Sequence, residues 1–271
     1  MIYVSATNRK LTESYVDRAV AGLPNAKKLT PKEILTKTDA TKVVMFGVLR
    51  GTHLVYKWAQ KNKIDFYYID RPYWGETRNP PYYVKIVKNN HLKYWQEDRP
   101  DDRFKQSFPW PIKPWKKDGK NIIVCPPSNA MKEFFGVHDW LDKTLKTLKE
   151  NTDRPIIVKT KGYNPIIGYD DDGGYKVVGR DNEKPSGPIE WENAHAIVTY
   201  NSNISLEATT RGIPCFTDVH NACAPISETD FTKIETPKYP EREPLYHSMA
   251  YGQFTGDEMR NGYAWKILDA S

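Results

Sequence analysis

The 271-residue sequence has no run of about 18 apolar residues, the length that a membrane-spanning helix needs. Its first residues, Met1 to Ala6, begin an apolar stretch with no basic leader, so we expect no signal peptide. Cysteine is scarce, and Cys125, Cys215 and Cys223 lack the spacing of metal ligands. Together these absences favour a chain that works in the reducing cytoplasm without a membrane span.

Signatures of several enzyme classes are also missing. The six histidines include no H-x-x-x-H pair, and no G-x-S-x-G nucleophile elbow occurs. Residues 47–53 (GVLRGTH) form neither a Walker loop nor a dinucleotide fingerprint. Residues 170–174 (DDDGG) lack the alternating ligands and closing glutamate of a calcium loop, and we interpret them as a hairpin tip. We therefore expect no bound metal and no required cofactor.

The charge balance is only slightly basic. Forty lysines and arginines stand against 34 acidic residues, giving a net charge of +6, while 39% of the residues are hydrophobic. This composition is typical of a globular protein with a mixed surface. The excess fits ordinary solubility charge as well as a polyanionic partner, so charge alone does not identify what the protein binds.

The first half of the chain contains a strand, turn, helix, strand pattern. Residues 41–52 are an apolar run that ends in Gly47 and Gly51, a helical period follows, and residues 63–70 form a second apolar run ending in Asp70. Such a unit predicts two parallel strands joined by a helix. The following segment, residues 71–118, is rich in proline, aromatic and basic residues. We expect its end, residues 109–119, to be an extended linker.

A second α/β series begins at residue 121. Apolar runs predict strands near residues 121–125, 155–158, 194–201 and 213–217, and helical spacing predicts helices at 139–150 and 202–212. The tail shows a helical period from Pro244 through Leu245, Met249 and Phe254, followed by a second helix at 256–268. We predict an α/β protein with two Rossmann-like domains, covering residues 1–118 and 119–240, and closing helices at 241–271.

Three polar residues stand where a buried strand meets a helix. Asn201, Ser202 and Asn203 follow the strand, and the helix that they open carries Glu207 one turn later. Free backbone N–H groups and the helix dipole at such a point favour a diphosphate, and Glu207 would accept hydrogen bonds from ribose hydroxyls. Polar residues also cap ordinary helices, so the pattern alone leaves both interpretations open.

Residues 198–217 resemble the donor-nucleotide motif of GT-B glycosyltransferases, above all capsule-polysaccharide enzymes and their phage relatives. The matching residues are Asn201, Ser202, Asn203, Glu207, Ala208, Gly212 and Pro214. Lys159 and Lys161 resemble the basic pair that meets the donor phosphates in that family, and residues 251–262 resemble its closing helices. The resemblance covers mainly residues 121–268, with a looser match over 43–76. Thr209 and Thr210 depart from the bulky apolar residues usual there.

The resemblance implies a metal-independent, GT-B-like glycosyltransferase with a central cleft between its two domains. The donor would be a nucleotide-sugar, most directly a UDP-sugar, held by residues 119–240. The acceptor would lie on residues 1–118, against Gly51, Arg71, Tyr73 and Trp74, and the closing helices would cross back to that domain.

Candidate catalytic residues lie in the acceptor half. Asp70 closes a buried strand and is our candidate base, although a carboxylate at a strand end is often only a turn former. Glu76, Glu97 and Asp98 are the alternates. Arg50 would offset leaving-group charge or be a solvated turn residue.

Three hypotheses about the function remain open, and two of them differ in the acceptor. Residues 71–118 interleave cations with aromatic rings, which suits DNA phosphates and a flipped base, so the first acceptor is a hydroxymethylated pyrimidine such as hydroxymethylcytosine in phage DNA. Double-stranded DNA would then be a partner, in the cytoplasm of the bacterial host. The alternative is a surface or capsular polysaccharide, and the third possibility is a non-catalytic nucleotide-sugar or nucleic-acid binding protein. The DNA hypothesis is preferred narrowly.

Overall fold

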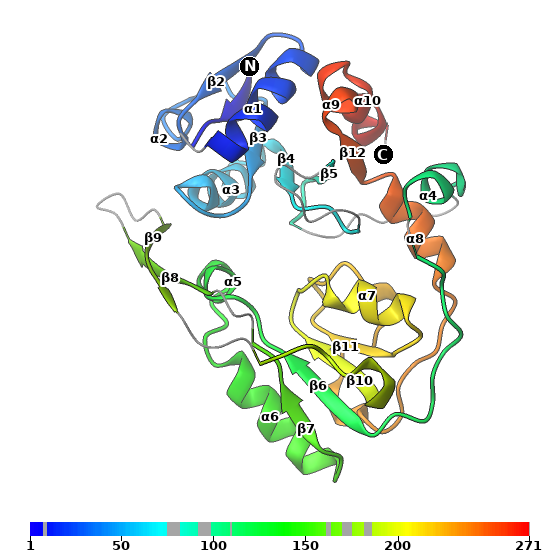
Figure 1. Cartoon of the computed structure of the whole chain (residues 1–271). Coiled ribbons are helices and arrows are strands. Elements are labelled where there is room, and N and C mark those ends of the chain that lie inside the picture. Colours follow the sequence, from blue (N-terminus) through cyan, green and yellow to red (C-terminus); the bar gives the residue numbers. More distant parts are fainter. Residues whose placement is uncertain are drawn as a thin grey trace. The chain divides into compact units, whose positions relative to one another are not determined.

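The computed structural model describes residues 1–7, 10–74, 82–91, 99–108, 110–160, 164–169, 175–181 and 186–270 (Figure 1). The chain divides into two compact units. Unit 1 comprises Met1–Phe108, Gly168–Lys176 and His247–Ser271, and unit 2 comprises Pro109–Ile167 and Val177–Tyr246. Each unit is considered by itself below. Of the described helices, none combines the length and the apolar character that crossing a bilayer requires.

Unit 1 contains a six-stranded mixed sheet in the order β12-β5-β4-β3-β1-β2. Its strands are β1 (Ile2–Ser5), β2 (Ala26–Leu29), β3 (Lys42–Phe46), β4 (Asp65–Asp70), β5 (Tyr83–Lys88) and β12 (Gln253–Thr255). The first four are parallel, and β5 runs antiparallel to both β4 and β12. The predicted unit of two parallel strands and a helix is confirmed as β3, α3 (Thr52–Lys61) and β4.

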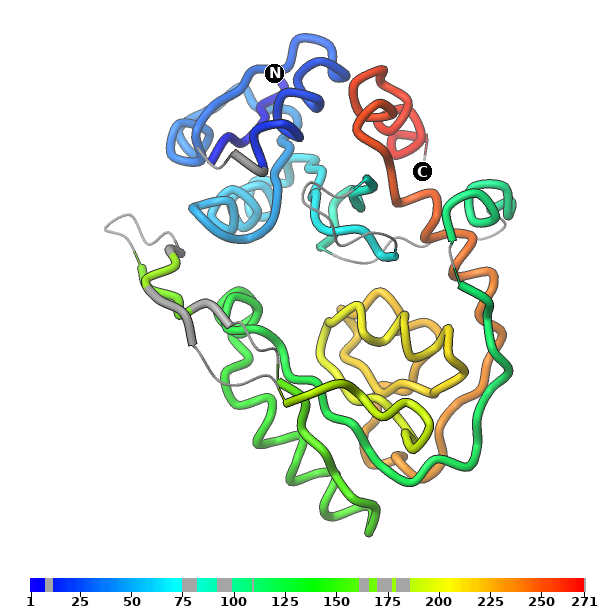
Figure 2. The backbone as a smooth tube through the Cα atoms, in the orientation of Figure 1, coloured from blue at the N-terminus to red at the C-terminus, as the bar shows by residue number. Residues whose placement is uncertain are grey.

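The helices of unit 1 come from both the N-terminal and the C-terminal parts of the chain. They are α1 (Lys10–Gly22), α2 (Pro31–Ile34), α3, α4 (Asp102–Ser107), α9 (Gly256–Arg260) and α10 (Tyr263–Asp269). Helix α9 packs against α1 (Figure 2). The close approach requires Gly22, because a Cβ there would lie 1.8 Å from the carbonyl oxygen of Met259. The Asp269 carboxylate fastens α10 to the sheet by accepting from Lys42 at 3.0 Å and from the Tyr67 hydroxyl at 2.5 Å.

Unit 2 is built on a four-stranded parallel sheet in the order β11-β10-β6-β7. Its strands are β6 (Asn121–Cys125), β7 (Ile156–Val158), β10 (Ala194–Thr199) and β11 (Cys215–Thr217), and its longer helices are α5 (Asn129–Phe135), α6 (Trp140–Asn151) and α7 (Ile204–Thr210). Alternate residues of β6 enter different cores: Ile122 packs with Leu148 of α6, and Ile123 packs with Ala208 of α7. Helices therefore cover both faces, and the predicted α/β class with parallel sheets is confirmed.

The remaining elements belong to neither of these two sheets. They are β8 (Asn164–Tyr169) and β9 (Tyr175–Asp181), which pair with each other, helix α8 (Glu243–Ala250), and the 3₁₀ turns η1 (Trp191–Asn193), η2 (Ala224–Ile226) and η3 (Phe231–Lys233). Residues 170–174, the predicted hairpin tip, lie outside the described residues. The division of the chain at residues 118 and 240 into an acceptor domain, a donor domain and closing helices stays a prediction.

The segment expected to be a linker is attached to unit 2 from residue 110 onward. Lys113 donates its backbone N–H to Thr210 at 2.9 Å, and Lys116 donates to Gly212 at 2.7 Å. Gly212 has a φ of +80°, and a Cβ there would lie 1.9 Å from the carbonyl oxygen of Pro114. We call residues 110–118 the docked arm, because backbone hydrogen bonds hold it along unit 2.

The predicted tail helix ends earlier than its apolar period suggests. Helix α8 stops at Ala250, and Phe254 lies on strand β12, opposite Val84 of β5. Placing Phe254 on a helix was therefore wrong. Hydrogen bonding to a strand about 170 residues away in the sequence overrides the local period here, as tertiary pairing often does.

Candidate functional site

The carboxyl edge of the unit 2 sheet has a topological switch point. The chain leaves β6 through α5 and α6 to reach β7, whereas it leaves β10 through α7 to reach β11 on the other side. Strands β6 and β10 are neighbours, so their connections diverge at the carboxyl ends of these two strands. Ligands of open α/β sheets bind at such a point. The loops there are residues 126–128 and 200–203.

Residues 201–203, which we call the donor turn, lie in the second of these loops. Asn201 is buried. The Ser202 hydroxyl accepts from the N–H of Ile204 at 3.3 Å, and Asn203 precedes the first turn of α7. The structure therefore places these three consecutive residues between the end of β10 and the first turn of α7, as predicted.

A buried asparagine that the sequence did not reveal braces this turn. Asn221 accepts from the Ser205 hydroxyl and from the N–H of Cys223, both at 2.8 Å. Its amide donates to the carbonyl oxygens of Tyr200 at 3.4 Å and Ser202 at 3.3 Å. One side chain thus ties the loop after β11 to the donor turn. A single asparagine in a loop carries no sequence pattern that would have identified it.

The other predicted donor residues are placed as follows. Lys159 directly follows β7, and its ammonium donates to the carbonyl oxygen of Ser186 at 2.7 Å. Lys161 lies outside the described residues. The Glu207 carboxylate accepts from Arg211 at 3.0 Å, and both side chains are partly exposed. Roles for these residues in donor binding stay predictions.

An aromatic cluster adjoins the donor turn. The rings of Phe135 and Tyr200 are 5.2 Å apart, and His220 lies 5.2 Å from Phe135 and stacks on Tyr200. The Nδ1 atom of His220 lies 2.5 Å from the carboxylate of Asp218. Burial raises the pKa of Tyr200 to about 12, and the Asp218 charge adds to the effect. His220 was one of the scattered histidines in the sequence, and only the fold places it here.

At the carboxyl edge of unit 1, Asp70 is the last residue of β4. Its carboxylate accepts from the N–H of Arg71 at 2.8 Å and from the Tyr68 hydroxyl at 3.1 Å. The Lys85 ammonium lies 3.9 Å away. The Asp70 side chain keeps 27% of its surface exposed, so it can still meet a ligand. The alternates Glu76, Glu97 and Asp98 lie outside the described residues.

The loop after β3 has an unusual backbone. Gly47, Arg50 and Gly51 all have positive φ, at +67°, +58° and +85°. This conformation costs a non-glycine residue such as Arg50 on the order of 1 kcal/mol. The Thr52 hydroxyl fixes the loop by donating to the carbonyl oxygens of Gly47 and Leu49. The loop is rigidly built, and the predicted roles of Arg50 and Gly51 stay predictions.

Two predicted acceptor-binding residues are core residues. Tyr73 and Trp74 are buried, and their backbone N–H groups both donate to the side-chain oxygen of Gln253. The Trp74 indole donates to the carbonyl oxygen of Ser107 at 3.1 Å. Packing accounts for both rings, whereas Arg71 is exposed. Acceptor binding by Arg71, Tyr73 and Trp74 stays a prediction.

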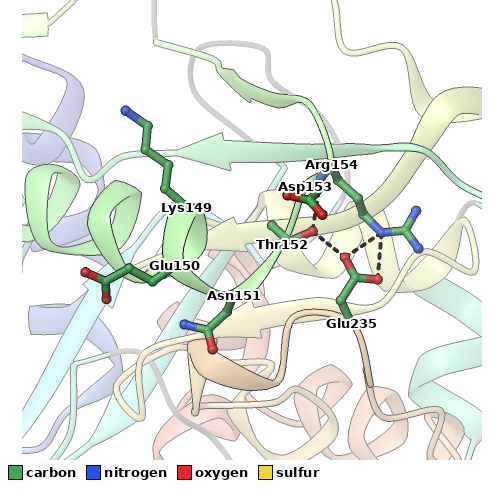
Figure 3. A pocket seen from close by; sticks show the side chains of 7 residues that line it. All are labelled: Lys149, Glu150, Asn151, Thr152, Asp153, Arg154 and Glu235. Atoms are coloured by element: carbon green, nitrogen blue, oxygen red, sulfur yellow. Dashed lines mark hydrogen bonds and ion pairs between the residues drawn. The ribbon is translucent and has the colours of Figure 1, made fainter.

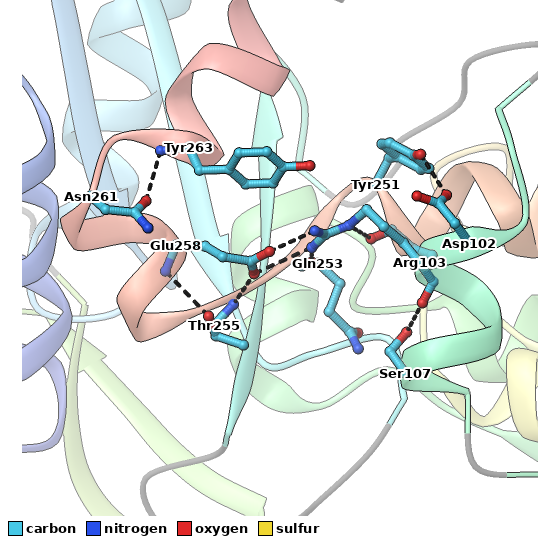
Figure 4. Close-up of polar contacts among 10 residues, drawn as sticks. Asp102, Arg103, Ser107, Tyr251, Gln253, Thr255, Glu258, Asn261 and Tyr263 are labelled. Atoms are coloured by element: carbon cyan, nitrogen blue, oxygen red, sulfur yellow. Dashed lines mark hydrogen bonds and ion pairs between the residues drawn. The ribbon is translucent and has the colours of Figure 1, made fainter.

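Two cations of the basic and aromatic segment, residues 71–118, make contacts inside unit 1. Arg103 pairs with Glu258 at 2.6 Å and donates to the carbonyl oxygens of Ala250 and Gln253 (Figure 4). Lys85 is buried. Neither cation is presented on a surface that DNA phosphates would contact. The structure therefore gives no support to the DNA-binding interpretation of these two residues.

A polar pocket lies at the opposite, amino edge of the unit 2 sheet. Its lining is Lys149, Glu150, Asn151, Thr152, Asp153, Arg154 and Glu235 (Figure 3). Arg154 donates to Glu235 at 2.9 Å and to the carbonyl oxygen of Gly119 at 2.8 Å. Burial would raise the pKa of Glu235, but hydrogen bonds from Thr152 and Arg154 prevail and lower it. Arg154 and Glu235 are thus already paired with each other, and the pocket lies away from the carboxyl ends of the strands.

No profile of a protein family and no curated protein matches the chain. Among solved structures, it is similar to "Thermosulfurimonas dismutans KpsC, beta Kdo 2,7 transferase", with a TM-score of 0.52 and 12% identity over 99% of this chain and 99% of that chain. The chain has the fold of that transferase. A second similar structure is "Thermosulfurimonas dismutans KpsC, beta Kdo 2,4 transferase", with a TM-score of 0.48 and 9% identity over 91% of this chain and 89% of that one.

Proposed function

We propose that this chain is a glycosyltransferase that moves a sugar from a nucleotide-activated donor to a hydroxyl group of a surface or capsular polysaccharide. The observation that carries the proposal is the braced donor turn at the switch point of a parallel sheet, within a fold shared end to end with a Kdo transferase. A polysaccharide acceptor is favoured over DNA because Lys85 and Arg103 serve inside unit 1.

In the proposed reaction, unit 2 holds the donor in a GT-B-like arrangement. The backbone N–H groups and polar side chains of the donor turn bind the donor phosphates, with Lys159 and Lys161 adding charge. Glu207 accepts from the ribose hydroxyls. A UDP-sugar and a nucleotide-activated Kdo are the donors to test first, and we propose that transfer needs no metal. Among the described residues, no group of three histidine, cysteine or acidic side chains is arranged to hold a metal ion.

Unit 1 would hold the acceptor. Asp70 takes the proton of the acceptor hydroxyl as its oxygen bonds to the anomeric carbon, and the bond from that carbon to the donor phosphate breaks. Arg50 offsets charge on the departing nucleotide. Gly51, Arg71, Tyr73 and Trp74 are the proposed acceptor contacts. Of these, Arg71 is the one with an exposed side chain suited to direct contact.

The test combines donor binding with product analysis. The protein is incubated with EDTA, a panel of UDP-sugars and nucleotide-activated Kdo, and either capsular oligosaccharides or DNA containing hydroxymethylcytosine. Mass spectrometry should show the oligosaccharide gaining one sugar, and NMR of the product gives its anomeric configuration. A sugar gained by DNA alone would overturn the polysaccharide acceptor, and donor binding without any transfer would favour a binding protein.

Variants then link activity to the donor turn. Asn201→Ala and Ser202→Ala should each weaken donor binding about tenfold, the effect of losing one hydrogen bond to a charged group. Asn261→Ala is the matched control, because the side chain is exposed and accepts from the N–H of Tyr263, in unit 1. Equal donor affinity in all three variants would contradict the proposed phosphate site.

A further inference from the structure

Three polar side chains form a row across three neighbouring strands of unit 1. Asp70 of β4 is paired with Lys85 of β5, and Lys85 is paired with Gln253 of β12. Directly opposed residues in antiparallel strands project from the same face, so the three side chains share one face. The adjoining pairs, Ile69 with Ile86 and Phe254 with Val84, are buried and apolar.

Lys85 is the unexpected member of the row. It is 2% exposed, yet the nearest opposite charge among the described residues, on Asp70, is 3.9 Å from its ammonium. The ring of Tyr73 lies 5.5 Å from the same nitrogen. Burying an ammonium is costly, because it loses its hydration. Burial lowers the pKa of Lys85, and the Asp70 charge acts against that decrease.

Gln253 fixes the other side of the row. Its side-chain oxygen accepts from the N–H groups of Tyr73 and Trp74, which follow Asp70 in the chain. Its side-chain nitrogen is buried and has no hydrogen-bond partner among the described residues. Because the two N–H donors set the orientation of the amide, Gln253 holds residues 73–74 against the row. It carries no charge that would compete with Asp70 for the lysine.

We propose that Lys85 is a positioning residue, whose buried ammonium fixes the Asp70 carboxylate at the carboxyl edge of β4. This inference rests on the proposed function, in which Asp70 accepts the proton of the acceptor hydroxyl. The cation stands on the buried side of Asp70, so the exposed part of the carboxylate stays open to an acceptor. In the part of the chain that the structure describes, the titratable groups around the pair are Tyr68 on β4, which donates to Asp70, and Tyr73.

The first test measures whether the two charges are coupled, without any need for activity. Asp70→Asn leaves the buried ammonium without its counter-charge, so it should lower the melting temperature of the full chain. In a Lys85→Met background the same Asp70→Asn change should cost little, because no buried charge remains. Lys88→Met is the matched background, since Lys88 lies on the same strand but pairs with Asp269 at 3.2 Å. An equal loss in all backgrounds overturns the inference.

The second test is kinetic and uses the donor and acceptor identified for the wild type. Lys85→Met should lower kcat about tenfold or more with little change in the KM for donor, because the Asp70 carboxylate is displaced while donor binding in unit 2 is untouched. In an Asp70→Asn background, Lys85→Met should have no further effect. A wild-type kcat in Lys85→Met, or a fall in kcat that is matched by an equal change in the KM for donor, overturns the positioning role. The two charges could be coupled in the first test while the wild type transfers no sugar. That result would overturn the proposed function, and with it the catalytic part of this inference.

Discussion

Replacing Asn221 with alanine tests how the donor turn is built. The asparagine is 1% exposed and takes part in four hydrogen bonds. Two are short, from the Ser205 hydroxyl and the Cys223 N–H at 2.8 Å, and two are longer, to the carbonyl oxygens of Tyr200 and Ser202. Alanine removes all four, and the polar groups left behind are buried away from bulk water.

The expected loss follows from these geometries. Each short hydrogen bond is worth about 1 kcal/mol and each long one about half as much, so the free energy of unfolding should fall by about 3 kcal/mol. Asn261→Ala is the control, because it removes one exposed hydrogen bond from the N–H of Tyr263. It should change the free energy of unfolding by at most about 0.5 kcal/mol.

Two measurements check this prediction. Urea unfolding followed by circular dichroism gives the free energy of unfolding, and calorimetric titration gives the affinity for the donor nucleotide. Asn221→Ala should lower both at a temperature where the protein stays folded. A loss of stability below about 0.5 kcal/mol would refute the bracing role. Lower stability with unchanged donor affinity would instead separate the brace from donor binding.

Three further predictions concern the fold and its response to pH. Gly212→Ala should cost about 2–4 kcal/mol in urea unfolding, because it adds a clash with the Pro114 carbonyl to the strain of positive φ. Gly136→Ala, at φ +68° with open space around it, should cost only about 1 kcal/mol, and equal losses would contradict this reasoning. Burial would raise the pKa of Asp269, but hydrogen bonds from Tyr67 and two lysines lower it overall. The stability that it contributes is present above the ordinary aspartate pKa and lost as pH falls through the lowered value, so Asp269→Asn should flatten the acid decline in melting temperature. Arg103→Met should cost about 3 kcal/mol in urea unfolding by leaving a partly buried carboxylate unpaired, and a loss under about 1 kcal/mol would show that the pair is dispensable.

Local pattern was sufficient for the central parallel strands. Strands β3, β6 and β10 are each built around a short apolar run, and such runs indicate strands buried on both faces. The position of the donor turn could be predicted for the same reason. It directly follows β10, and the topology of a parallel sheet places the residues after a strand at the carboxyl edge.

The edge of the unit 1 sheet was not predictable in this way. Strand β12 has three residues and pairs with β5, which lies far away in the sequence. Its formation depends on that partner rather than on its own composition, since short strands gain their stability from neighbours. The bracing role of Asn221 was hidden for a similar reason: its partners belong to a different loop, and only the packed sheet brings the loops together.

The basic and aromatic segment shows why composition did not identify the acceptor. Its alternation of cations and rings fits a nucleic-acid surface, but in β5 it also fits a strand whose alternate residues face in opposite directions. Val84 and Ile86 enter the apolar pairs, while Lys85 turns to Asp70. A count of positive charges does not distinguish a cation that meets solvent from one that acts on a buried neighbour. The ion partner makes that distinction, and in this protein the partner of Lys85 is the residue that we propose as the base.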